Sequence, residues 1–123
     1  MTVEFEYTNL NPLDTKREDT PKMTTYLIVR AEVPEADREA FDRWYEAEHL
    51  PDAKAATRAR AAFRGWSDTT PGVHSAFYEF EDISQVRAIL AGDEGKALIA
   101  EFDRIWQGGV TRTREVIELK QTL

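Results

Sequence analysis

The sequence predicts an α+β domain whose elements follow in the order βαββαβ. Three observations favour this class: a β-rich run over 25–33 that ends at Pro34, an amphipathic helical pattern directly after it, and a turn over 68–72 between two strand-like runs. A second helical region and a final β-rich run over 110–119 complete the order. The length of 123 residues fits one domain, since a domain usually holds ~100–200 residues.

The composition excludes several classes of protein. The sequence has no cysteine, which rules out disulfide scaffolds, zinc–thiolate sites and cysteine nucleophiles. Its net charge of −7 opposes contact with nucleic acids and anionic membranes, and no apolar run reaches the ~20 residues of a membrane span. We therefore expect no nucleic-acid partner and no membrane partner, and we expect a cytoplasmic protein.

Residues 1–22 are interpreted as an N-terminal arm or linker, and the domain covers 23–123. Within the arm, Val3, Phe5 and Tyr7 alternate with glutamates, which is the pattern of a short half-buried strand. The alternative is that this strand adds to an exposed sheet edge, including the edge of a partner subunit.

The first predicted strand has one apolar face and one mixed face. Its alternation places Leu27, Val29 and Ala31 on one side and Ile28 among polar residues on the other. The mixed face, which Phe77 continues on a later strand, is too apolar to remain bare. We therefore expect a homodimer.

The first predicted helix begins at Pro34, a residue that suits the first helical position. We expect it to end at about His49, because Pro51 disfavours helical geometry in the residue before it. Phe41, Tyr45 and His49 are spaced by four, so they share one stripe, and this stripe faces inward because its aromatic rings need burial.

The second half of the sequence predicts two strands, an interrupted helix and a last strand. The strands cover 62–67 and 73–80, on either side of the turn. The helix begins near Ile83, is interrupted at 92–95 by two glycines, and ends at 108–109, where two further glycines stop it.

The two histidines are the candidate acid/base residues. His74 begins the third strand on the same face as Tyr78, the face that we assign to the helices, so it can share a space with His49. Imidazoles titrate near neutral pH, and with Tyr45 as a hydroxyl donor they form a general acid/base set. For His49, a helix end favours the protonated form. The alternatives are that His49 only caps the helix or pairs with a carboxylate, and that His74 touches solvent.

Large aromatic residues are the candidate lining of a substrate pocket. Trp66 and Trp106 are large enough to line a pocket for an aromatic substrate, and packing in the core or an interface is the alternative. The full candidate set is Phe41, Trp44, Trp66, Tyr78 and Trp106.

Other kinds of site have little support in the sequence. Two histidines and Glu48 are a minimal set for zinc or iron, but the spacings typical of such sites are missing, and nothing favours haem. No glycine-rich phosphate loop is present. The basic run from Lys54 to Arg64 is a solvated face or a binding site for an anionic substrate. We expect no metal ion and no cofactor.

Three short stretches of the sequence resemble a known family. They are VPE at 33–35, FDRWYEAEHLP at 41–51 and YEFED at 78–82. These resemble the V-P-E strand exit, the F-x-x-W-Y helix with its E-H-L-P end, and the Y-x-x-E-D strand end of the EthD-like branch of the dimeric α/β-barrel superfamily. The resemblance extends over about residues 25–120.

The resemblance implies a ferredoxin-like βαββαβ subunit with an antiparallel four-stranded sheet that packs on the sheet of a second subunit. A pocket then lies between each sheet and its own helices. In cyclase-like relatives a histidine starts the third strand, and His74 matches that position. Relatives also include muconolactone-type isomerases and cofactor-free monooxygenases.

Three functions follow as hypotheses. The first is a small cofactor-independent acid/base enzyme of lyase, isomerase or cyclase type, which acts on an aromatic, polyketide-like or lactone metabolite. The second is a non-catalytic binder of a hydrophobic metabolite or a pathway accessory protein. The third is a cofactor-free monooxygenase in which Trp66, Tyr78 and Trp106 flank an electron-rich aromatic substrate.

Overall fold

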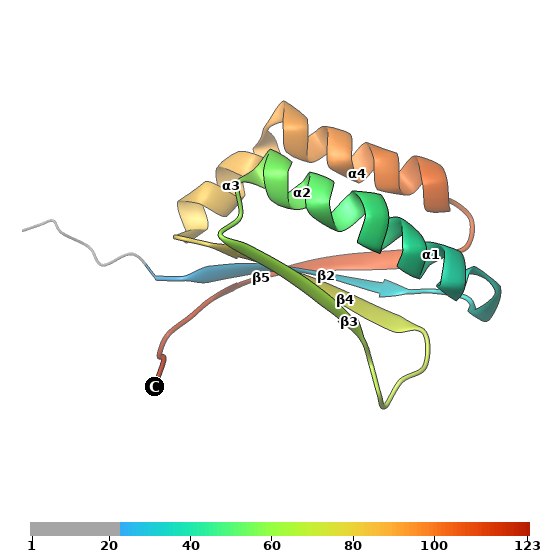
Figure 1. Cartoon of the computed structure of the whole chain (residues 1–123). Helices are drawn as coiled ribbons and strands as arrows, with labels where there is room; N and C mark the ends of the chain where they lie inside the picture. The colour runs from blue at the N-terminus through green and yellow to red at the C-terminus, as the bar shows by residue number, and fades with distance from the viewer. Residues whose placement is uncertain (1–22) are drawn as a thin grey trace, which may run out of the picture.

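The computed structural model describes residues 23–123, which form an antiparallel four-stranded sheet with helices on one face (Figure 1). The strand order is β3-β4-β2-β5, and all three strand pairs are antiparallel. This is the predicted α+β, ferredoxin-like subunit. Its elements are β2 (Thr25–Glu32), η1 (Glu35–Asp37), α1 (Arg38–Trp44), η2 (Tyr45–His49), α2 (Leu50–Thr57), β3 (Ala61–Trp66), β4 (Val73–Phe80), α3 (Ile83–Ala91), α4 (Asp93–Trp106) and β5 (Thr111–Glu118).

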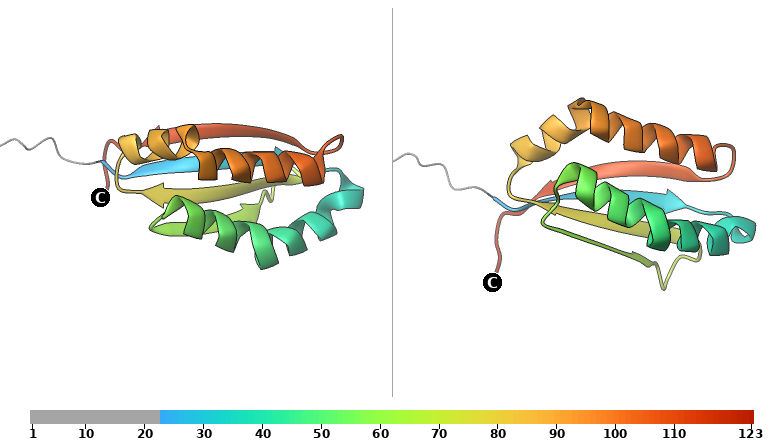
Figure 2. Two further views of the ribbon diagram at one scale, coloured as in Figure 1. Left: turned by 90° about the horizontal axis from the view of Figure 1, so that it is seen from above. Right: turned by 45° about the horizontal axis from the view of Figure 1, so that its top comes forward.

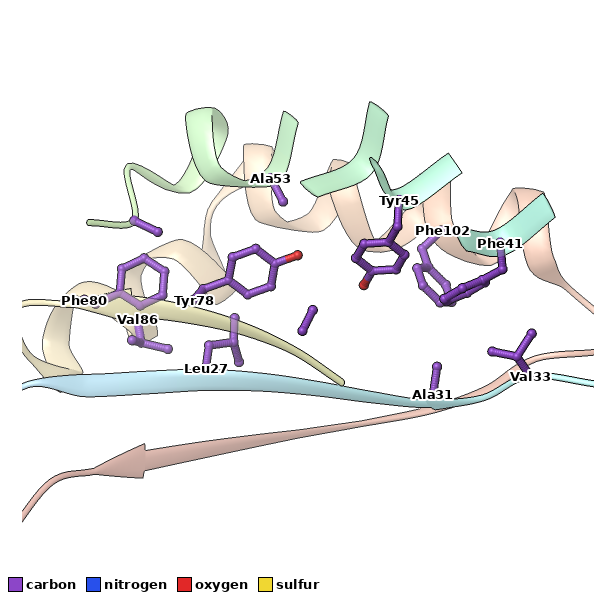
Figure 3. Packing of buried hydrophobic residues seen from close by; sticks show 12 residues of the cluster. Leu27, Ala31, Val33, Phe41, Tyr45, Ala53, Tyr78, Phe80, Val86 and Phe102 are labelled. Atoms are coloured by element: carbon purple, nitrogen blue, oxygen red, sulfur yellow. The ribbon is translucent and has the colours of Figure 1, made fainter. Parts of the chain in front are cut away.

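The helices cross the sheet in two lines. Helices α1 and α2 lie over the β3–β4 half of the sheet, and α4 lies over the β2–β5 half (Figure 2). Beneath them, Leu27 and Ala31 of β2 are paired with Tyr78 and His74 of β4, and all four side chains are buried. The apolar face predicted from alternation is therefore the face that the helices cover, and the core lies between the two layers (Figure 3).

The first helix does not end at His49, which corrects the sequence prediction. Leu50 keeps right-handed helical geometry, with φ −65° and ψ −47°, and the helix continues through α2 to Thr57. Between α1 and α2 lies a π-helical turn, η2, in which the N–H of Leu50 donates to the carbonyl oxygen of Tyr45. Pro51 then falls in the first turn of α2, where a missing N–H is tolerated.

The π-helical turn also decides which rings stack. In a π turn a residue lies beneath the one five positions later, and the ring of Trp44 stacks on the imidazole of His49 with centroids 4.4 Å apart. The stripe formed by Phe41, Tyr45 and His49 is buried, as predicted, whereas Glu48 is exposed.

The interruption of the second helical region is confirmed. Helix α3 ends at Ala91 and α4 begins at Asp93. The two helices come very close at Gly95, because a Cβ atom at this position would overlap the carbonyl oxygen of Ile89. A glycine is therefore required where α4 passes the end of α3.

The other face of the sheet carries no helix within residues 23–123 (Figure 1). Phe63 of β3 stacks on Phe77 of β4 with ring centroids 5.2 Å apart and is 47% exposed, and Ile117 of β5 is 39% exposed. Alternation thus correctly places apolar side chains among polar ones on this face. The arm expected over 1–22 lies outside the described residues.

In the described part of the chain, none of the helices combines the length and the apolar character that crossing a membrane requires.

Candidate functional site

His49 lines a small, half-open cavity between the helices and the sheet. The cavity has a volume of about 60 Å³ and is called the His49 cavity below. The imidazole is 7% exposed, and its Nδ1 has no hydrogen-bond partner within residues 23–123. Buried polar atoms nearly always have a hydrogen-bond partner, so this nitrogen, in a residue that lines an open space, makes His49 the candidate functional residue.

His49 is neutral at neutral pH. Burial, followed by the positive charge of Arg112, lowers the pKa of this imidazole from its ordinary 6.5 to about 4. The expectation that a helix end favours the protonated form is wrong, because the helix continues beyond His49 and a cation lies nearby. A neutral imidazole can accept a proton or donate a hydrogen bond without first losing a charge.

The wall of the His49 cavity is largely apolar. Its polar side chains are those of His49 and Thr57, from the helices, and of Arg112 and Arg114, from β5, and Gly95 also lines it. The hydroxyl of Thr57 donates to the carbonyl oxygen of Ala53 at 2.6 Å. The apolar lining consists of Leu27, Val29, Ile89, Leu90, Leu98, Ile99 and Phe102.

Tyr45 lies between the two histidines. Its ring centroid is 4.9 Å from that of His49 and 4.5 Å from that of His74. Burial raises the pKa of Tyr45 to about 12, so its hydroxyl keeps its proton. The hydroxyls of Tyr45 and Tyr78 point into the same space between helix and sheet (Figure 3), and burial, followed by the nearby Tyr45, also raises the pKa of Tyr78. Both tyrosines are therefore hydrogen-bond donors rather than bases.

His74 is fully buried and contacts a charged pair. Arg64 Nη1 lies 3.3 Å from His74 Nε2, and the same nitrogen lies 2.8 Å from Asp42 Oδ1. Because a guanidinium only donates, His74 Nε2 accepts, and the proton of the neutral ring is on Nδ1. Burial, followed by the charge of Arg64, lowers the pKa of His74 to about 4. The expected alternative, a His74 that touches solvent, is wrong.

Asp42 connects this charged pair to an indole. Trp66 Nε1 donates to Asp42 Oδ1 at 2.7 Å, and Arg64 Nη2 donates to the Asp42 carbonyl oxygen at 3.3 Å. The hydrogen bond from Trp66, followed by that from Arg64, lowers the pKa of Asp42. The carboxylate therefore ties strand β3 to helix α1.

Several predicted pocket aromatics pack against one another instead of lining the His49 cavity. Phe41 is at their centre and is fully buried, with its ring 5.1–6.2 Å from the rings of its neighbours. We call this group the aromatic cluster. Its members are Phe41, Trp44, Tyr45, Trp66, His74 and Trp106. The indole nitrogens of Trp44 and Trp106 are buried without a partner in the described residues.

The structure thus brings the predicted residues together in a line rather than around one space. His49 lies at the cavity, Tyr45 lies behind it, and His74 lies behind Tyr45. Among residues 23–123, no group of three or more His, Cys, Asp or Glu side chains is placed to hold a metal ion.

Sequence reasoning missed Arg112 and Arg114. The last strand was predicted, but its arginines were not singled out. A signal was present in the sequence, because Arg112, Arg114 and Val116 alternate with other residues and therefore lie on one face of the strand. In the structure, Arg114 is opposite Val29 and Val116 is opposite Leu27 of β2. The basic run that was singled out does not form one site, because Arg64 pairs with Asp42 whereas Arg60 pairs with Glu79 at 3.1 Å.

No protein-family model matches the chain, and no curated protein matches it in sequence. Solved structures do match its fold. A protein of the ethyl tert-butyl ether d (EthD) family from Bacillus halodurans C-125 is 22% identical, with a TM-score of 0.65, over 79% of this chain and 99% of that one.

Two further structures extend the likeness. A protein of unknown function from Nitrosomonas europaea is 24% identical, with a TM-score of 0.58, over 85% of this chain and 96% of that one. A mutant of SnoaB, a cofactor-independent oxygenase from Streptomyces nogalater, is 15% identical, with a TM-score of 0.61, over 81% of this chain and 96% of that one. These likenesses show the ferredoxin-like fold of the chain, and the EthD match agrees with the resemblance found in the sequence.

Proposed function

We propose that this protein is a cofactor-independent acid/base enzyme that moves a proton on a small, largely apolar metabolite. The observation that carries the proposal is the position of His49, a neutral imidazole that lines a largely apolar cavity and whose buried Nδ1 has no partner within residues 23–123. A base in a water-poor space is suited to take a proton from carbon. Lyase, isomerase and cyclase reactions on aromatic, polyketide-like or lactone substrates all include such a step.

In this proposal the three polar residues have different roles. His49 is the general base, because it alone of the three lines the His49 cavity. Tyr45 is a hydroxyl donor that also fixes the plane of the His49 ring by edge contact. His74 supports Tyr45 from behind, so we assign it a positioning role. The residues expected from the sequence to line a substrate pocket are not among those that line the His49 cavity, and in this proposal they form an aromatic layer behind it: Phe41, Trp44, Trp66, Tyr78 and Trp106.

We also propose that the protein works as a homodimer through the uncovered face of its sheet. Phe63, Phe77 and Ile117 supply apolar area to this face, and the resemblance found in the sequence implies a subunit whose sheet packs on that of a second copy. Light scattering is expected to give twice the mass of one chain, and Phe63→Lys is expected to shift the mass toward that of a single chain. A wild-type protein of single-chain mass at micromolar concentration would disprove the dimer.

A cofactor-free monooxygenase is the second candidate, and one observation favours it. The fold matches that of SnoaB, which is described as a cofactor-independent oxygenase. In this reading the same deprotonation gives a carbanion that reacts with dioxygen. The candidates for contact with an electron-rich aromatic substrate are Trp66, Tyr78 and Trp106.

One experiment separates these functions. A panel of lactones, enolisable aromatic ketones and hydroxylated polycyclic aromatics is incubated with the protein in D₂O, while NMR follows deuterium incorporation and an electrode follows dioxygen. Deuterium incorporation that His49→Gln abolishes, without dioxygen uptake, supports the acid/base enzyme. Dioxygen uptake supports the monooxygenase. Binding with neither reaction, detected by tryptophan fluorescence, supports the non-catalytic binder.

A further inference from the structure

Two arginines lie side by side on the helix-facing side of the sheet. In the register of β5 against β2, Arg112 is opposite Ala31 and Arg114 is opposite Val29. Ala31 is buried beneath the helices, so its pairing partners on this face point the same way. Both arginines line the His49 cavity, at a place where a sheet normally presents apolar side chains to its helices.

Arg112 is held in place with most of its hydrogen-bonding capacity unused. Its guanidinium carbon lies 4.1 Å from the centroid of the Phe102 ring, and its side chain is 12% exposed. It donates one hydrogen bond within residues 23–123, from Nη2 to Asp103 Oδ1 at 2.7 Å. A guanidinium has five N–H donors, so a ligand in the cavity finds a rigid, oriented donor group.

Arg114 adds a second positive charge beside Arg112. The described residues include no carboxylate within ion-pair distance of Arg114, and burial, followed by the charge of Arg114, lowers the pKa of Arg112. Two cations at one wall repel each other unless an anion lies between them. In a protein with a net charge of −7, this wall is a local positive site.

We propose that the ligand of the His49 cavity is a small apolar carboxylic acid whose carboxylate binds Arg112 and Arg114. The proposal rests on the proposed function for the choice of cavity, and it names the substrate class. The hydrocarbon lining suits an apolar body that is partly enclosed, because the cavity is small and half open, and the planar guanidinium forks suit a carboxylate. With the acid group at the arginines, the carbon skeleton extends toward His49, which lines the same cavity.

The competing explanation is that the arginines are ordinary solvated charges on an edge strand. Arg114 is exposed, which agrees with that explanation. Arg112 does not agree with it, because its side chain is largely buried against Phe102. Solvated charges would give no preference between a carboxylate and a neutral molecule of the same shape.

The test is a pair of titrations with benzoate and benzamide, which share a shape and differ in charge at pH 7. Isothermal titration calorimetry is expected to show benzoate binding at least tenfold more tightly than benzamide. Arg114→Gln should weaken benzoate binding about tenfold and leave benzamide unchanged. Arg104→Gln is the matched control, since it removes an equal charge from an exposed position on α4 outside the cavity, and it should change neither affinity.

Equal binding of benzoate and benzamide, no binding of either, or an unchanged benzoate affinity in Arg114→Gln would each overturn the proposal. The outcome is separable from that of the proposed function. Benzoate binding does not require a proton transfer, so it should persist in His49→Gln. Loss of proton exchange with retained carboxylate selectivity would reject the enzyme and keep the ligand class.

Discussion

The aromatic cluster and the His49 cavity lie in the same layer between helices and sheet, and each contains one histidine. Burial is the main cause that lowers the pKa of both imidazoles to about 4. The two histidines nevertheless have different surroundings. Each has a buried Nδ1 without a partner in the described residues, but His74 is enclosed by rings and its Nε2 accepts from Arg64, whereas His49 lines an open space. A shifted pKa therefore does not mark a functional residue unless a ligand can reach it.

The two regions also differ in how the positive charges of their arginines are balanced by carboxylates. Arg64 meets the carboxylate of Asp42 at 2.8 Å, and this carboxylate also receives the Trp66 indole N–H. Arg112 shares its wall with a second cation, Arg114, and within residues 23–123 it pairs with the largely exposed Asp103 alone. In the first arrangement one cation meets one carboxylate, whereas in the second two cations share one carboxylate among the described residues.

The largest expected effect tests whether the aromatic cluster is a packed core. Phe41→Ala removes a fully buried ring at the centre of the cluster, and we expect it to lower the free energy of unfolding by about 3–5 kcal/mol. Leu98→Ala, at the half-buried cavity wall, should cost about 1 kcal/mol. Urea unfolding followed by tryptophan fluorescence measures both. Similar costs for the two variants would remove the distinction between a packed and an open region.

The second prediction concerns pH. An unfolded imidazole titrates near 6.5 and the folded ones near 4, so the unfolded chain binds more protons between these values. Stability should therefore be unaffected above pH 6.5 and fall as the pH drops toward 4. At about 1.36 kcal/mol per pKa unit, the full loss reaches about 3 kcal/mol for each histidine. Between pH 7 and pH 4, the free energy of unfolding should change less with pH in His49→Gln and in His74→Gln than in the wild-type protein. The same pH dependence in all three proteins would contradict the lowered pKa values.

The third prediction tests the close approach that closes one end of the cavity. Gly→Ala in a helix usually stabilises by about 1 kcal/mol. At Gly95 the added methyl group would overlap the Ile89 carbonyl oxygen, so we expect Gly95→Ala to cost about 2 kcal/mol instead. Thermal unfolding shows whether Gly95→Ala raises or lowers the stability of the protein. Gly65→Ala is the control, because nothing lies within 4 Å of a Cβ atom at that position.

The smallest effect separates charge from hydrogen bonding at Asp42. Asp42→Asn keeps an acceptor for the Trp66 indole and removes the charge that faces Arg64, so we expect a loss of about 1 kcal/mol. The pKa of Asp42 is lowered in the folded protein, so this stability is present above pH 4 and is lost as the pH falls through the folded pKa. Proton-exchange activity should be unchanged, since Asp42 is remote from the cavity. If Asp42→Asn were stable but inactive, His74, which is connected to Asp42 through Arg64, would have a larger role than positioning.

Much of the fold was predictable because burial follows simple periods. The period of two in β2 and β4 correctly placed Leu27, Ala31 and His74 under the helices, and the period of four placed Phe41 and Tyr45 opposite them. The end of the first helix was not predictable in this way. Pro51 favours a break by its local chemistry, but Leu50 keeps helical geometry after a π turn and Pro51 falls in the first turn of α2, where its missing N–H is tolerated.

The candidate site was predictable only in part, because it depends on strand register. The sequence indicated that His49 lies on the buried stripe. It did not indicate that Arg112 and Arg114 lie beneath the same helices, since this follows from the pairing of β5 with a strand more than 80 residues earlier. Nor did it show that Trp66 gives its indole N–H to Asp42.

The π-helical turn has a consequence for how this segment tolerates changes of length. One residue of an α-helix turns the chain by about 100°. The extra residue that the π turn η2 accommodates would otherwise rotate every residue after it by that angle. Deletion of the exposed Ala47 would replace the π turn by regular α-helix and leave the buried stripe in place, because Phe41, Tyr45, His49, Ala53 and Thr57 would then follow the spacing of three and four that one face of an α-helix requires. When related sequences are aligned, a single-residue gap between 45 and 49 is therefore compatible with the same buried side, whereas the same gap within α2 would turn the residues after it out of the stripe.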